Sequence, residues 1–324
     1  MGNVIDVKDL RREYVTHKGW VRRRKHIVKA VDGITFYVRE GEIFGLLGQN
    51  GAGKTTTIKM LITLLAPTGG TCRVLGHDTM AESKSIRSRI NFIFGGELGV
   101  YRRLSARDNL KYFANLYRVE PHIAQKRIEE ILDLVDLNDK ADLLVETYSK
   151  GMIQRLQIGR GLVNDPDIIL MDEPTVGLDP LGARMLRDVI RKLKERGKTV
   201  LLTTHYMYEA DELCDRIAII HRGKIVAMNT PRGLKQSVKG NEAIEVTVDR
   251  AGPDALDRIK ALQGVKALTV KECDTGEIIH VSYSADTDIS GPLLEALAAG
   301  KVLSWSRREL TLEDAFIILT GEGS

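Results

Sequence analysis

The chain has 324 residues, of which 43% are hydrophobic and 28% charged, a composition that excludes collagen-like, coiled-coil and disordered proteins. The net charge of +4 is too small to indicate a nucleic-acid-binding protein by itself. No long apolar run and no signal pattern occurs, so we expect neither a membrane span nor a signal peptide. Three scattered cysteines fit neither a disulfide framework nor a zinc site, which favours a reducing cytosol.

Two apolar runs near the start, at residues 34–38 and 43–47, predict strands joined by a turn. The second is followed by a glycine-rich loop and by helical periodicity over residues 53–65. The loop has two glycines five residues apart, Gly48 and Gly53, followed by Lys54 and Thr55, which is the pattern of a phosphate-binding loop. In such a loop backbone N–H groups surround phosphate oxygens at a helix N-terminus. Lys54 would neutralise the β and γ phosphates, and Thr55 would offer its hydroxyl to Mg²⁺.

A helix-rich region is expected over residues 105–145, followed by strands at 168–171 and 200–202. Both strands are unbroken apolar runs, which is typical of parallel strands buried on both faces. Asp172 and Glu173 follow the first strand, at the edge where ligands bind in such sheets. Asp172 is therefore placed to hold a metal ion, and Glu173 to polarise an attacking water. Ser149, taken alone, predicts a plain helix cap, and His205 a surface residue at a strand end.

Residues 217–220 and 224–227 predict a hairpin, and the pattern changes near residue 239. The remaining chain predicts strand, helix, two strands, helix and strand, the βαββαβ order of a ferredoxin-like domain. We place the domain boundary there, which divides the chain into residues 1–238 and 239–324.

Three segments together resemble the successive motifs of ABC transporter ATPase subunits. They read LLGQNGAGKTTTIKML, YSKGMIQRLQIGRGLVNDPDIILMDEPTVGLDP and TTHYMYEADELCDRIAIIHRGKIV, and the resemblance covers roughly residues 4 to 236. The ending, LTLEDAFIILTG, resembles the close of drug-exporter ATPases of the daunorubicin-resistance type and of related sodium exporters. The implied fold is a doubly wound α/β P-loop NTPase core with an antiparallel β subdomain and a helical subdomain at about 97–150, plus the small α+β (ferredoxin-like) domain.

The resemblance also implies roles for individual residues. Nucleotide contacts fall on the phosphate loop and on an aromatic residue that stacks on adenine: Tyr14, Gly48, Asn50, Gly51, Gly53, Lys54, Thr55 and Thr56. Asp172 and Thr55 would support magnesium, Glu173 would be the general base, and His205 the switch histidine. The signature motif, with Ser149 and Gly151, would reach across a head-to-tail dimer to the other subunit's γ-phosphate, and Asp179 would lie in the loop that links the two sites.

This chain departs from the family at three places. Gly96 stands where a metal-contacting glutamine is usual, and Lys150 replaces the first glycine of the signature. The segment after Tyr14 is longer than usual, so Trp20 is an alternative stacking residue. A separate basic cluster, Arg22-Arg23-Arg24-Lys25, is expected to be a solvated loop, with a surface of anionic lipid as the next interpretation and nucleic acid as the last.

We therefore expect the cytosolic ATPase subunit of an ABC exporter, which hydrolyses ATP with Mg²⁺ and drives a separately encoded permease on the cytoplasmic face of the membrane. Its partner would be a second copy or a homologous ATPase, and nucleic acid is not expected as a ligand. An importer ATPase and a non-transport ABC ATPase acting on nucleic acid are the alternatives. The short spacing from Lys54 to Ser149 leaves no room for the coiled coils of chromosome-maintenance ATPases, and the intact Glu173 argues against a non-hydrolytic regulatory subunit.

Overall fold

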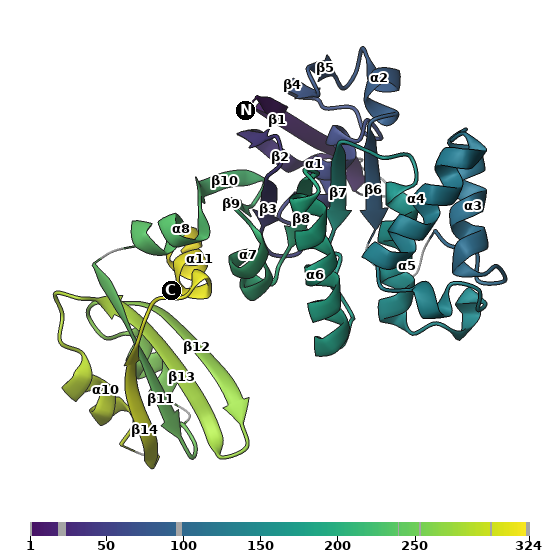
Figure 1. Cartoon of the computed structure of the whole chain (residues 1–324). Helices are drawn as coiled ribbons and strands as arrows, with labels where there is room; N and C mark the ends of the chain where they lie inside the picture. Colours follow the sequence, from purple (N-terminus) through teal and green to yellow (C-terminus); the bar gives the residue numbers. More distant parts are fainter. Residues whose placement is uncertain are drawn as a thin grey trace. The chain divides into compact units, whose positions relative to one another are not determined.

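The computed structural model describes residues 2–18, 24–94, 99–238, 240–252, 254–298 and 300–321, with the side chains of residues 16–18 and 24–26 left out. These residues form two compact units, Met1–Ile225 and Val226–Ser324, which are coloured in sequence in Figure 1. The expected boundary near residue 238 lies between the first helix and the first full strand of the second unit. No helix of the described residues is long and apolar enough to cross a bilayer.

A six-stranded sheet of order β10-β9-β3-β8-β7-β6 forms the centre of the first unit. Its strands are β3 (Ile43–Leu47), β6 (Ile90–Phe94), β7 (Ile168–Asp172), β8 (Thr199–Thr204), β9 (Arg216–His221) and β10 (Lys224–Asn229). Neighbours from β9 to β6 pair in parallel. Residues 168–171 of β7 and 200–202 of β8 are buried and the two strands pair in parallel, which confirms the predicted parallel strands.

The register of this sheet brings polar residues to one edge. Leu47, the last residue of β3, pairs with Thr204 of β8, and Asp172 at the end of β7 pairs with Thr203. Because the strands are parallel, the loops that follow them leave the sheet at the same edge.

The first unit also contains a second, antiparallel sheet of order β2-β1-β4-β5. It is formed by β1 (Asn3–Lys18), β2 (Arg24–Arg39), β4 (Gly69–Val74) and β5 (His77–Asp78). The strand expected at 34–38 is the end of the long β2, and the hairpin of β1 and β2 was not predicted from the sequence. The arginines at 22 and 23, Trp20 and Gly96 lie outside the described residues, as do the side chains of the lysine at 25 and the arginine at 24.

Helices complete the first unit. They are α1 (Lys54–Leu61), α2 (Ser83–Arg87), α3 (Ala106–Leu116), α4 (Pro121–Leu134), α5 (Lys150–Leu162), α6 (Pro180–Glu195) and α7 (Met207–Leu213), with 3₁₀ turns at Asn138–Lys140 and Val145–Thr147. The helices α3 and α4 lie in the helix-rich region expected at 105–145, where they contact each other, and both also contact α5. Side-chain caps start two of them, because Ser105 accepts from the Asp108 backbone N–H and Ser149 from that of Met152.

The second unit begins with part of β10 and α8 (Pro231–Ser237) and contains a four-stranded sheet of order β12-β13-β11-β14. Its elements are β11 (Asn241–Val248), α9 (Ala255–Lys260), β12 (Val265–Cys273), β13 (Gly276–Ser284), α10 (Ser290–Ala296), β14 (Val302–Arg308) and α11 (Leu312–Thr320). All three strand pairs are antiparallel, so the predicted ferredoxin-like order is confirmed. Helices α9 and α10 pack on the apolar face that includes Ile244, Val246 and Ile279.

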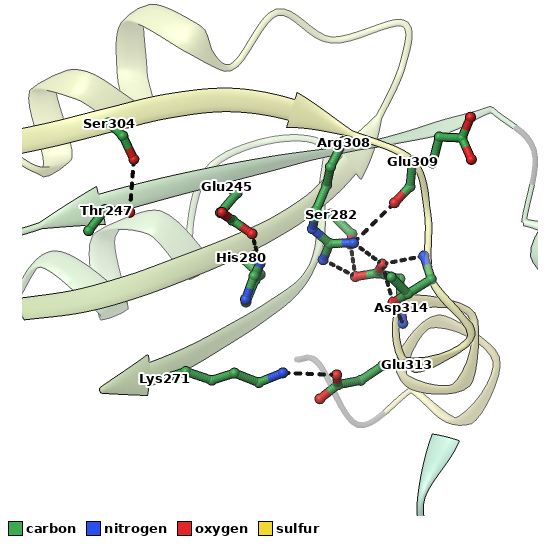
Figure 2. Close-up of polar contacts among 11 residues, drawn as sticks. Glu245, Thr247, Lys271, His280, Ser282, Ser304, Arg308, Glu309, Glu313 and Asp314 are labelled. Atoms are coloured by element: carbon green, nitrogen blue, oxygen red, sulfur yellow. Dashed lines mark hydrogen bonds and ion pairs between the residues drawn. The ribbon is translucent and has the colours of Figure 1, made fainter. Parts of the chain in front are cut away.

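Polar contacts attach α11 to the other face of this sheet (Figure 2). Asp314 accepts hydrogen bonds from Ser282 Oγ at 2.9 Å and from the guanidinium of Arg308 at 2.6 and 2.9 Å. It also accepts from the backbone N–H of Thr311 at 2.8 Å, and together with Thr311 it forms a capping box. Ser282 alternates with residues of the apolar face, which is why it points to the side that α11 occupies.

Candidate active site

The phosphate loop runs from the end of β3 to the start of α1, as the sequence predicts. A side chain at Gly48 would place its Cβ 2.3 Å from the Ile220 carbonyl oxygen. Gly53 has φ +112°, and its Cβ would lie 2.5 Å from the Ala30 carbonyl oxygen. Glycine is therefore required at both positions, because the loop backbone passes directly against β2 and β9.

Lys54 is buried, with 4% of its surface exposed. Its ammonium donates to the carbonyl oxygens of Gly48 at 2.6 Å and Gln49 at 3.1 Å, and lies 3.1 Å from Glu173 Oε1. These contacts hold a positive charge inside the loop, where an anion bound to the backbone N–H groups would meet it.

Asp172 lies between two threonine hydroxyls. Thr55 Oγ1 donates to its Oδ2 at 2.8 Å, and Thr203 Oγ1 donates to its Oδ1 at 2.5 Å. A carboxylate beside a hydroxyl fits Mg²⁺, which takes oxygen ligands and usually keeps few protein ligands, with phosphates and waters completing its coordination. No group of three or more His, Cys, Asp or Glu suited to a metal occurs among the residues that the structure describes.

Glu173 has a strained backbone, with φ +49°. Its N–H donates to both the carbonyl oxygen and Oγ1 of Thr203, each at 3.1 Å. The side chain is about three-quarters buried, and its Oε1 lies 3.2 Å from His205 Nδ1 as well as near the Lys54 ammonium. A partly exposed carboxylate between a cation and an imidazole can accept a proton from water.

A cavity of about 130 Å³ lies over the loop. It is lined by Ala30, Asn50, Gly51, Gly53, Lys54, Thr55, Thr56 and Glu173. Seven of these eight residues were predicted from the sequence to contact nucleotide or to act in catalysis, and Ala30 was not. Thr203, which orients both Asp172 and Glu173, was also missed, although a polar residue at the end of an apolar strand is a signal that could have found it.

The other predicted site residues do not line this cavity. Ser149 and Gly151 lie at the N-terminus of α5, and Asp179 caps α6 by accepting from the Gly182 N–H at 3.1 Å. Tyr14 lies in β1 opposite Val28, with the Arg12 guanidinium 4.8 Å from its ring centre.

Comparisons with known proteins agree with this geometry. The family model described as ABC transporter matches residues 31–176. The ABC transporter ATP-binding protein NatA of Bacillus subtilis is 40% identical over 68% of this chain and 89% of its own length. The daunorubicin/doxorubicin resistance ATP-binding protein DrrA of Streptomyces peucetius is 39% identical over 90% of this chain and 88% of its own length.

Solved structures show the same fold. An ATP-binding subunit of an ABC transporter aligns with a TM-score of 0.60 and 28% identity over 72% of this chain and 92% of its own. A dimeric post-hydrolysis structure of the ATP-binding cassette MJ0796, bound to ADP and Pi, aligns with a TM-score of 0.60 and 27% identity over 70% and 98%. The chain belongs to the ATP-binding subunits of ABC transporters, which bind and hydrolyse ATP, and it is closely related to the exporter ATPases among them.

Proposed function

We propose that this chain hydrolyses Mg-ATP at the cavity over the phosphate loop and drives export through a separate membrane permease, at the cytoplasmic face of the membrane. The observation that supports this most is the meeting of Lys54, Asp172, Glu173 and His205 at one edge of the parallel sheet. The relative DrrA is named as a daunorubicin/doxorubicin resistance ATP-binding protein, and this favours an exporter over the importer and nucleic-acid alternatives.

Each residue then has a defined task. The loop N–H groups and Lys54 bind the β and γ phosphates, and Thr55 with Asp172 would hold Mg²⁺. Bound Mg²⁺ would neutralise charge that develops on the phosphate oxygens. Glu173 accepts the proton of the attacking water, and His205 holds the Glu173 carboxylate in place from the end of β8.

The second half of the site is proposed to come from another subunit. Ser149 and Gly151 stand outside the chain's own cavity, at the N-terminus of α5, where open N–H groups favour an anion. Leu181, Tyr206 and Tyr208 are exposed close in sequence to Asp179 and His205, and 65%, 45% and 70% of their surfaces are accessible. A head-to-tail pair would cover these apolar residues and complete two shared sites.

A groove of about 350 Å³ supports docking of a permease. It lies between β6, α3 and α5 and is lined in part by Phe92, Phe94, Phe113, Tyr117 and Arg160. Aromatic residues together with arginine are enriched at the centres of protein interfaces.

A mixing experiment tests the shared site. Lys54→Ala disables the phosphate loop, and Gly151→Asp places a negative charge where the γ-phosphate of the partner would bind. A Cβ at Gly151 meets only Gly182 Cα, at an ordinary 3.6 Å, so the second variant should fold. Each variant alone should lack Mg-dependent phosphate release, whereas their mixture should regain it, because a mixed pair contains one intact site.

Failure of the mixture to regain activity, with an active parent protein, would contradict head-to-tail sharing between copies of this chain. Failure of the parent itself to release phosphate from Mg-ATP would contradict the proposed hydrolysis. Isolation of the chain from membranes together with a permease subunit tests the transport role.

A further inference from the structure

Gln154 is a buried polar residue of α5 that the proposed mechanism does not use. Only 3% of its surface is exposed, and its neighbours Ile153 and Leu156 belong to the apolar core. Its side-chain amide donates a hydrogen bond to the carbonyl oxygen of Phe94, the last residue of β6, at 3.3 Å. Burying an amide costs free energy that an apolar side chain would not, so a glutamine at this position requires a reason beyond packing.

Phe94 lies at the edge of the sheet that carries the nucleotide site. It pairs with Asp172 in the parallel register of β6 and β7, which places its backbone beside the proposed magnesium ligand. The same face of α5 also packs on β6 farther along, because a Cβ at Gly161, seven residues after Gln154, would lie 3.2 Å from Ile93 Cδ1. Since β6 pairs with β7 along its whole length, β6 is held by the sheet, and α5 is the element that this contact positions.

Gln154 lies close to the signature motif at the start of α5. Gly151 precedes it by three residues, so the two lie on the same side of the helix, and Ser149 caps that helix. The first turn of α5 also packs on α6, since a Cβ at Gly151 would lie 3.6 Å from Gly182 Cα. The signature motif is therefore carried by a short stretch of helix that Gln154 ties to the sheet by a hydrogen bond.

We propose that Gln154 is a positioning residue for the signature motif: its bond to Phe94 holds Ser149 and Gly151 where they meet the γ-phosphate bound by the other subunit. The inference rests on the proposed sharing of sites between two subunits. Because the signature motif of one chain completes the site of the other, loss of this bond should impair the partner's site and spare the chain's own.

The mixing experiment with Lys54→Ala and Gly151→Asp can locate such a defect. In a mixed pair the intact phosphate loop comes from the Gly151→Asp chain and the intact signature motif from the Lys54→Ala chain. Gln154→Met removes the N–H donor and keeps an unbranched side chain. Added to the Lys54→Ala chain, it should lower phosphate release at saturating Mg-ATP at least about tenfold, because a misplaced group loses much of its effect on the transition state. Added to the Gly151→Asp chain, it should leave the rate within about twofold.

The control is Gln125→Met at an exposed position of α4, which should have no effect in either chain. A loss from the Gly151→Asp chain as large as that from the Lys54→Ala chain would overturn the proposal, since Gln154 would then only support the fold. An unchanged rate with Gln154→Met in the Lys54→Ala chain would overturn it as well.

If Gln154→Met does not fold, as judged by thermal unfolding, Gln154→Asn takes its place. Asparagine keeps the amide but is one methylene too short to reach Phe94, so the same loss is expected from the Lys54→Ala chain, and an unchanged rate would reject the proposal. If the mixture regains no activity even with Gln154 intact, the proposed sharing of sites has failed, whatever the role of Gln154.

Discussion

Lys54 is the residue whose removal should weaken nucleotide binding itself. Its ammonium is fixed by the carbonyls of Gly48 and Gln49, so it is already oriented before a phosphate binds. Hydrogen bonds to charged groups contribute about 1.5–3 kcal/mol each, so Lys54→Ala should weaken binding of Mg-ATP by about 10- to 100-fold. Titration calorimetry with a non-hydrolysable ATP analogue measures this change.

Lys59 in the same helix provides the control, because it is exposed and has no contact with the cavity. Lys59→Ala should bind the analogue like the parent protein. Equal affinities of Lys54→Ala and the parent would contradict the assignment of the phosphate loop.

The chemical roles of single residues could be predicted from the sequence where backbone groups form the binding site. The spacing of Gly48, Gly53 and Lys54 is sufficient, because the loop binds through N–H groups whose positions follow from a strand, a turn and a helix. The strained φ of Glu173 and the bond from Gln154 to Phe94 were not predictable, because both depend on packing between segments distant in sequence. The roles given to Tyr14, Ser149, Gly151 and Asp179 remain predictions.

The attachment of α11 to its sheet gives a prediction at the scale of elements. Asp314 is 5% exposed and is the acceptor for Arg308, Ser282 and Thr311. Asp314→Ala would leave the Arg308 guanidinium partly buried without its carboxylate, which destabilises by about 3 kcal/mol. Urea unfolding followed by Trp305 fluorescence, in a Trp20→Phe background, reports on this sheet, since these are the 2 tryptophans of the chain.

The control is the neighbouring Glu313, which pairs with Lys271 at the surface (Figure 2). Glu313→Ala should change stability by less than about 1 kcal/mol.

Burial alone would raise the pKa of Asp314, but hydrogen bonds from Arg308 and Thr311 outweigh it and hold this pKa below its ordinary value. The difference in free energy of unfolding between Asp314→Ala and the parent protein should therefore be largest at neutral pH and should shrink as the pH falls through the pKa of Asp314. Equal unfolding of the two at neutral pH would contradict the account.

Elements with strong periodicity were predicted, and those defined by distant pairing were not. The order βαββαβ followed from alternation and turn residues, and it limits the sheet to few topologies. The hairpin of β1 and β2 was missed because residues such as Val15 and Ile27 pair across it without a regular apolar pattern, and both remain half exposed. The two-residue β5 was missed because it is very short and lies at the sheet edge, and β4 because it begins at two glycines and buries only two of its six residues.

We predict that the two parts of the chain have different functions, nucleotide binding in the first and assembly in the second. Lys54, Asp172, Glu173 and His205 all precede residue 239, so truncation after Lys239 should leave nucleotide binding nearly intact. The truncation removes α11, which packs on α8 beside the buried Leu234, and we expect weaker ATP-dependent pairing or weaker assembly with the permease. Calorimetry and light scattering measure the two properties.

A folded truncation that loses nucleotide binding would contradict the boundary. Unchanged pairing and unchanged transport would leave the second part without a role in assembly.

The central claim is that Glu173 is the base of an ATPase, and phosphate release by Glu173→Gln tests it most directly. The amide keeps the size of the side chain and its position beside Lys54 but cannot accept the proton of water. We predict that the parent protein releases phosphate from ATP only with Mg²⁺, and that Glu173→Gln binds Mg-ATP with similar affinity but turns over about 10²- to 10⁴-fold more slowly. Hydrolysis by Glu173→Gln at the parent's rate would contradict the account.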